Sequence, residues 1–157
     1  MSRGLRDRKE LHIALTILIM IFIFIQSALP ADLSQQESGL FVRILAGFLR
    51  MKEETLSFCV RKCAHFTEYL ILGASLCVTV RDMIKEKMHR TAYFCQNTAA
   101  WCIGTLYAVT DEIHQAFVPG RSCELRDVLI DSCGVLAGVL IIWHLQCSRA
   151  SDRSGDH

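Results

Sequence analysis

The stretch LHIALTILIMIFIFIQSAL, residues 11–29, decides the class of fold. Among its nineteen residues only His12 is an acid or a base. About 20 apolar residues are what an α-helix needs to cross the hydrocarbon core of a bilayer. A soluble four-helix bundle would carry polar stripes along whole helices, and this stretch has none. We therefore expect a membrane anchor, with a cleaved signal peptide as the alternative.

Three more apolar blocks follow, at residues 64–80, about 94–110 and about 128–146. The chain has 157 residues, 52% of them apolar, which fits one domain whose apolar residues are concentrated in blocks. Backbone groups must be satisfied internally in lipid, so each block should be helical. We predict an all-α, polytopic membrane protein with four transmembrane helices, a single domain over 1–146, and a polar cytoplasmic tail at 147–157 that is disordered.

Lysine and arginine predict the orientation. Four bases lie before the first block, and four more lie between the second and third blocks. They are Arg3, Arg6, Arg8 and Lys9, and then Arg81, Lys85, Lys87 and Arg90. Short loops rich in these residues stay in the cytoplasm, so both termini should be cytoplasmic and the protein should lie in the cell membrane.

The long link between the first two blocks contains an amphipathic segment, Ser38–Glu54. Its apolar residues recur at helical spacing, with bases outside the stripe. They are Leu40, Phe41, Ile44, Leu45, Phe48 and Leu49. We expect an interfacial helix that lies flat on the outer surface, chiefly as a connector, with roofing of a pocket or recruitment of a lipid as alternatives.

Polar residues stand at one end of each later block. They are His65 and Glu68, then Asp111, Glu112, His114 and Gln115, then Asp127 and Asp131. With alternating helix directions, all three sets fall at the outer level of the membrane. Spacings of three or four residues place most members of each set on one helix face, so we expect one shared pocket.

Glycines supply two further expectations. Gly134 and Gly138 are four residues apart on the stripe of Asp131, and small residues at that spacing let helices approach closely in a bilayer. Pro119 and Gly120 suit the middle of a tight turn, because proline presets one φ angle and glycine accepts a positive one.

Two regions carry a family resemblance. RKCAHFTEYLILGASL, residues 61–76, and DEIHQAFVPGRSCELRDVLIDSCGVLAG, residues 111–138, resemble the signature regions of the VanZ-like family of bacterial integral membrane proteins. The matching residues are His65, Phe66, Glu68, Tyr69, Asp111, Glu112, His114, Gln115, Phe117, Pro119, Gly120, Arg121, Asp127, Asp131 and Gly134. Val135 departs from the pattern, in which a small residue is more usual. The resemblance implies a cell-envelope role tied to resistance against glycopeptide antibiotics, chiefly of the teicoplanin type.

The residue types allow two kinds of chemistry in the pocket. In the first, a divalent metal such as zinc or manganese is held by His65, Glu68, Glu112, His114 and Asp131, and assists a hydrolase or transferase. In the second, the acids and imidazoles act as general acid and base without metal. The candidate catalytic residues are His65, Glu68, Asp111, Glu112, His114, Asp127 and Asp131, and the candidate substrate-binding residues are Tyr69, Gln115 and Arg121.

Arg121 would hold a phosphate or carboxylate bidentately. A pocket at this depth would take a membrane lipid or a lipid-linked envelope precursor, and no nucleic acid. The main alternative is a non-catalytic scaffold or binding protein, whose polar cluster pairs with Arg61, Lys62, Arg121 and Arg126 to pack the helices.

A proton or ion relay is the weakest alternative, because the inner halves of the second and fourth blocks offer few polar residues. His12 is expected to be solvated, and the eight cysteines are expected to form no required disulfide.

Overall fold

The computed structural model describes residues 2–30, 42, 44, 52–84 and 90–155. They form four α-helices, α1 (Ser2–Ala28), α3 (Glu53–Met83), α4 (Arg90–Gln115) and α5 (Leu125–Gly155), and no strand occurs among these residues. Each expected apolar block lies on one of these helices, so the all-α prediction is confirmed.

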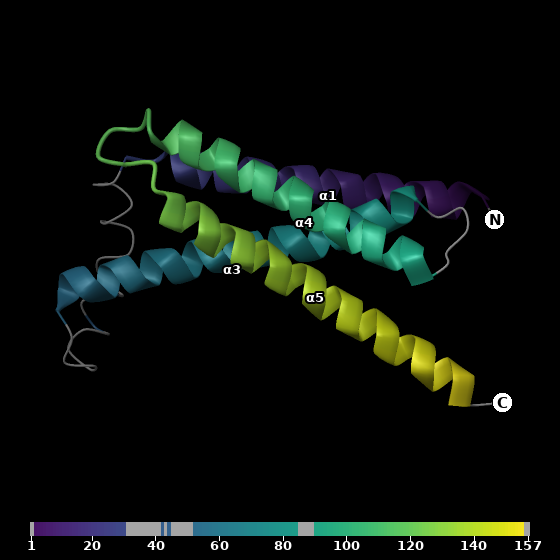
Figure 1. Ribbon diagram of the computed structural model, residues 1–157. Helices are drawn as coiled ribbons and strands as arrows, with labels where there is room; N and C mark the ends of the chain where they lie inside the picture. The colour runs from purple at the N-terminus through teal and green to yellow at the C-terminus, as the bar shows by residue number, and fades with distance from the viewer. Residues whose placement is uncertain (1, 31–41, 43, 45–51, 85–89, 156–157) are drawn as a thin grey trace.

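Three of the helices are long and apolar enough to cross a membrane, over Arg6–Ala28, Glu53–Met83 and Leu125–Ser148. Helix α4 does not meet that criterion, since it contains Gln96 and Asn97 and ends in a polar stretch. It nevertheless packs against α1, α3 and α5 within the same bundle (Figure 1). A multi-pass membrane protein is therefore indicated, and a membrane crossing by α4 remains a prediction.

Two boundaries differ from the sequence prediction. Helix α3 begins at Glu53, eleven residues before the apolar block at Ala64, so the amphipathic turns before that block are helical too. Helix α5 continues to Gly155, so the expectation of disorder was wrong for residues 147–155. The tail is polar, but it extends a helix that is already nucleated, and elongation of a helix is easier than its initiation.

Most of the expected interfacial helix, Ser38–Glu54, lies outside the described residues and stays a prediction. Val42 is described, is buried, and packs with Leu56 and Val60 of α3. Glu53 and Glu54 belong to the first turn of α3 itself.

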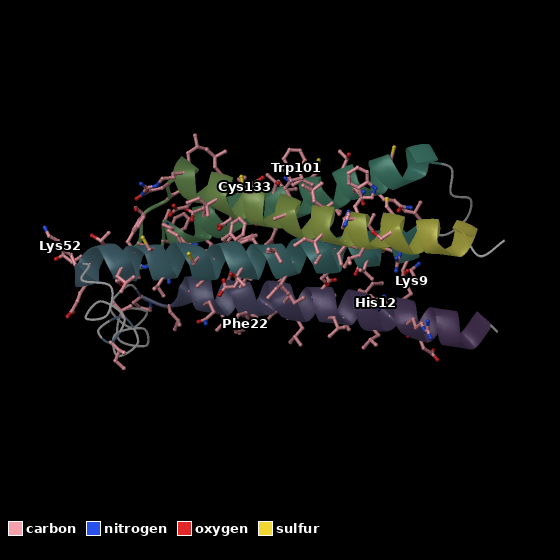
Figure 2. The ribbon with its side chains drawn as sticks, turned by 90° about the horizontal axis from the view of Figure 1, so that it is seen from below. Lys9, His12, Phe22, Lys52, Trp101 and Cys133 are labelled. Atoms are coloured by element: carbon pink, nitrogen blue, oxygen red, sulfur yellow. The ribbon has the colours of Figure 1, made fainter. Side chains whose placement is uncertain are left out.

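Helices α3 and α4 each pack against all three other described helices, and α3 makes the more extensive contacts, chiefly with α5. Helix α1 contacts α3 and α4 but, within the described part of the chain, not α5. Both termini lie at one end of the bundle, and the α4–α5 connection lies at the other (Figure 1). Lys9 and Lys52 mark these opposite ends in Figure 2.

An apolar core joins the helices at mid-length. Ile23, Tyr69, Leu72 and Val135 are fully buried in one cluster. The outward faces carry large apolar side chains, including Phe22 on α1 and Trp101 on α4, which lie on opposite faces of the bundle (Figure 2). Such a surface matches a lipid environment.

The tightest packing lies where α5 crosses α3. A Cβ atom placed on Gly138 would lie 2.0 Å from the carbonyl oxygen of Leu70, and one on Gly134 would lie 2.6 Å from that of Phe66. The predicted close approach through these two glycines is confirmed. The crossing is equally close on the side of α3, where a Cβ atom placed on Gly73 would lie 2.2 Å from the carbonyl oxygen of Val135.

A second polar cluster lies near the end of the bundle that holds the termini. His12 Nδ1 lies 2.7 Å from Asp82 Oδ2, so the prediction of a solvated histidine was wrong. One turn along α1, the Thr16 hydroxyl lies 2.7 Å from that of Ser75 and 2.8 Å from that of Thr79. These contacts fix the register of α1 on α3.

Replacement of Gly138 by leucine should separate α5 from α3, because the added side chain meets backbone atoms that cannot rotate away. Overpacking of this kind typically costs about 1 to 3 kcal/mol. We expect lower yield and a lower thermal midpoint in detergent. Cys133→Leu is the matched control, since Cys133 is exposed on the same helix. A normal midpoint for Gly138→Leu would contradict the close crossing.

Candidate functional site

A cavity of about 180 Å³ lies at the end of the bundle opposite the termini. Its walls come from the first half of α3, the end of α4, the α4–α5 connection and the start of α5. The lining residues are Phe58, Arg61, Lys62, His65, Glu112, Gln115, Gly120, Arg121, Ser122, Glu124, Asp127, Ile130 and Asp131. Five of the eight polar residues that were expected to converge from three helices line this cavity, His65, Glu112, Gln115, Asp127 and Asp131, and Arg121 of the α4–α5 connection joins them.

The α4–α5 connection is a tight turn, as the sequence predicts. Gly120 has a φ of 76°, and the Arg121 N–H donates to the Val118 carbonyl over 3.1 Å. Proline in the second position and a positive-φ glycine in the third are typical of a type II turn. The turn places Arg121 directly over the cavity.

Arg121 ties this turn to the end of α1. Its Nε donates to Leu29 O at 3.0 Å, one terminal nitrogen donates to Gln26 O at 3.3 Å, and the other donates to Gln115 Oε1 at 3.2 Å. Three of its five N–H groups are thus occupied by the protein. Burial and the nearby Arg61 guanidinium lower the pKa of Arg121, against an opposing effect of Asp111.

A second contact between α1 and α4 lies behind Arg121. Asp111 Oδ2 accepts from the Ser27 hydroxyl at 2.7 Å and from Gln115 Nε2 at 3.1 Å. Asp111 is 2% exposed and does not line the cavity. Its place in this network is that of a helix-packing residue.

The start of α5 is held by two acids. Glu112 Oε2 accepts from the backbone N–H of Glu124 at 3.1 Å, immediately before the helix begins. Asp127, in the first turn of α5, pairs with Lys62 of α3. Both contacts span different helices, so they fix the width of the cavity.

Three of the predicted site residues lie beside the cavity rather than on its wall. Glu68 Oε2 lies 3.9 Å from His65 Nδ1, which is too long for a hydrogen bond. Tyr69 is fully buried in the core. The His114 ring stacks on Phe24 of α1, with centroids 4.3 Å apart, and so faces α1 instead of the other acids.

The predicted metal ligands are not assembled. Within the described residues, which include all five candidates, no group of three or more histidines, cysteines, aspartates or glutamates is placed to hold a metal ion. The reason is the position of His114 against Phe24 and of Glu68 outside the lining. All eight cysteines are free thiols.

On the α3 wall of the cavity, sequence reasoning missed Phe58 and gave Arg61 and Lys62 a packing role only. Phe58, Arg61, Lys62 and His65 recur at spacings of three to four residues along α3, which places them on one face. The second span was expected to begin at Ala64, so this stripe was divided. A search for helical periodicity upstream of the apolar block would have found it.

Four packed helices, three of them fit to cross a membrane, with a charged cavity at one end, define a multi-pass helical membrane protein with a polar site. A family model described as VanZ/LLP1 matches residues 12–146, and the chain belongs to this VanZ-like family. No curated protein and no solved structure matches the chain.

Arg121 is expected to stabilise the fold through its fork of N–H groups. Arg121→Gln removes the donors to the two carbonyls of α1, and an unpaired acceptor costs about 1 to 3 kcal/mol when buried. Arg121→Lys should behave similarly, because a single ammonium group does not reproduce the planar fork. The readout is the thermal midpoint of the purified protein.

Arg126→Gln is the control, because Arg126 is exposed and its pair with Glu124 lies at the surface. A midpoint for Arg121→Gln as high as that of the control would show that the Arg121 contacts do not hold α1 in place.

Proposed function

We propose that this protein binds the anionic headgroup of a lipid or lipid-linked envelope component in the outer leaflet, and thereby protects the cell against lipoglycopeptides of the teicoplanin type. The observation that carries the proposal is Arg61. It lines the cavity, is half-buried, and forms no ion pair with any residue that the structure describes.

The environment of Arg61 favours an anion. Its neighbour Lys62 is already paired with Asp127, and the nearby Arg121 adds like charge. A bound anion would offset the repulsion between the two neighbouring guanidinium groups, so a ligand that carries negative charge is favoured. Phosphate and carboxylate match its planar array of donors.

The apolar rim favours a lipid over a soluble anion. Phe58 and Ile130 line the cavity beside the charged residues, and Leu125 and Leu129 are exposed close to it on α5. Acyl chains that remain in the bilayer would contact these side chains while the headgroup enters the cavity.

The distribution of basic residues supports a position of the cavity at the outer leaflet. The basic residues near the N-terminus, with Arg81 in the last turn of α3 and Arg90 at the start of α4, belong to the end of the bundle that holds the termini (Figure 1). By the positive-inside tendency that end is cytoplasmic, so the cavity would face the outer leaflet. Family membership supports the link to resistance.

A purely structural role is the second candidate, and a specific observation favours it. The contacts of Asp111, Ser27, Gln115 and Arg121 form a connected network that holds α1 to α4. Two members of this network, Gln115 and Arg121, also line the cavity. The network leaves Arg61, Asp131 and His65 without a packing explanation.

Arg61→Gln should reduce protection against a teicoplanin-type antibiotic at least about tenfold while the protein reaches the membrane at normal abundance. The change removes the charge but keeps most of the side-chain volume, and no ion pair of the fold is lost. Arg126→Gln is the matched control, because Arg126 does not line the cavity. Unchanged protection in Arg61→Gln would overturn the binding role, and equal loss of protection and abundance would favour the scaffold.

A topology experiment checks the side of the membrane. An export-dependent reporter fused after Gly120 should be active, and the same reporter fused after Lys87 should be inactive. A cytoplasmic fluorescent reporter should give the opposite pattern at both positions. Reversed results would place the cavity in the cytoplasmic leaflet.

A further inference from the structure

One of the carboxyl groups that line the cavity has neither a hydrogen-bond donor nor an ion-pair partner in the described part of the chain. Asp131 is 2% exposed and lines the cavity, yet it makes no hydrogen bond or ion pair with any described residue. The neighbouring acids on the cavity wall do have partners. Asp127 is paired with Lys62, and one oxygen of Glu112 accepts from the Glu124 N–H, while the other Glu112 oxygen has no partner among the described residues.

An acid in this position needs a donor. A buried carboxyl group without hydrogen bonds is costly, and in a membrane protein such residues face a cavity or a partner. The donor must therefore enter the cavity, where Asp131 and Glu112 are accessible and Arg61 forms part of another wall.

A metal ion or an ammonium group fits this position less well than a hydroxyl group. The described residues offer no three-residue metal cluster. Three bases and four acids line the cavity, and an ammonium beside Asp131 would still be repelled by the unpaired Arg61 and the nearby Arg121. Hydroxyl groups donate to carboxylates without adding charge, and they lose less solvation energy than an ion on entering a buried site.

The size of the cavity allows more than a bare phosphate. One water needs on the order of 10–15 Å³ by this measure, so a cavity of about 180 Å³ has space for on the order of ten waters. A phosphate with a small polyol attached can therefore reach both walls.

We infer that the cavity recognises a phosphate that carries neighbouring hydroxyl groups, a glycerol-phosphate or sugar-phosphate headgroup. Arg61 binds the phosphate, and Asp131 with the unpaired oxygen of Glu112 accepts from the hydroxyls. This inference rests on the proposed binding of an anionic headgroup and adds the selectivity for polyols.

The test compares two lipids with the same charge. Purified full-length protein is placed in phosphatidylcholine nanodiscs that contain either phosphatidylglycerol or phosphatidylmethanol, and lipid binding is measured by native mass spectrometry. Both lipids are monoanionic phosphodiesters, and only the first has free hydroxyls. One hydrogen bond to a charged acceptor contributes about 1.5 to 3 kcal/mol, so we expect at least about tenfold tighter binding of phosphatidylglycerol.

The variants separate the two halves of the site. Asp131→Asn and Glu112→Gln should each reduce the preference for phosphatidylglycerol at least about threefold and leave phosphatidylmethanol binding unchanged. Arg61→Gln should weaken both lipids, and Arg126→Gln should weaken neither. If Asp131→Asn fails to fold, the wild-type comparison and Glu112→Gln still decide the outcome.

Further experiments show whether the ligand is a lipid or a soluble headgroup, and whether a negative result contradicts the polyol selectivity or the proposed function. The glucosyl and methyl esters of a polyprenyl phosphate, both monoanionic phosphodiesters, form a second matched pair, for which the same preference is expected. If soluble glycerol 3-phosphate competes as effectively as the lipid, the headgroup alone is the ligand. That result would keep the polyol selectivity and exclude a requirement for the lipid.

Equal binding of the lipids within both pairs, or a preference for phosphatidylethanolamine, would overturn the polyol selectivity alone. No binding of any anionic lipid above phosphatidylcholine would overturn the proposed function itself.

Discussion

The close crossing of α3 and α5 is the constraint on which the cavity depends. Gly134 and Gly138 bring the α5 backbone against Phe66 and Leu70, so the two helices have no freedom to slide or rotate at that level. Asp131 lies one turn before Gly134, and His65 lies next to Phe66. The glycine contact therefore determines that the acid of α5 and the polar face of α3 look into the same space.

The same crossing explains how the chain accommodates its departure from the family pattern. Val135 is fully buried where a smaller residue is more usual in the resembling sequences. Its side chain lies against Gly104 of α4, with a Cβ on that glycine placed 2.5 Å from Val135 Cγ1, while its backbone lies against Gly73. Two neighbouring glycines thus provide the volume that the valine takes.

The sequence predicted the helical class, the turn at Pro119–Gly120, the glycine crossing and the common level of the polar residues, because each depends on local periodicity or on a backbone requirement of one residue type. It failed where the outcome depends on which neighbour a side chain meets. Nothing local in the sequence shows that His114 stacks on Phe24, or that His12 reaches Asp82 seventy residues away. Nor does the sequence show that Arg121, which lines the cavity, also donates to two carbonyls at the end of α1 and to the side chain of Gln115.

The polar residues at the cavity end divide into two groups with different consequences. Those on the α1 side are joined by hydrogen bonds through Asp111 Oδ2, Gln115 and Arg121, and such a network gives the bundle its register. Those between α3 and α5 are left with an unpaired base and an unpaired acid on facing helices. The polar cluster at the other end, around His12 and Thr16, is separated from the cavity along α1 by buried Ile23 and along α3 by buried Leu72. A continuous relay through these helices would have to pass that apolar layer, whereas a binding site needs only unpaired groups beside a cavity, and Arg61 and Asp131 provide them.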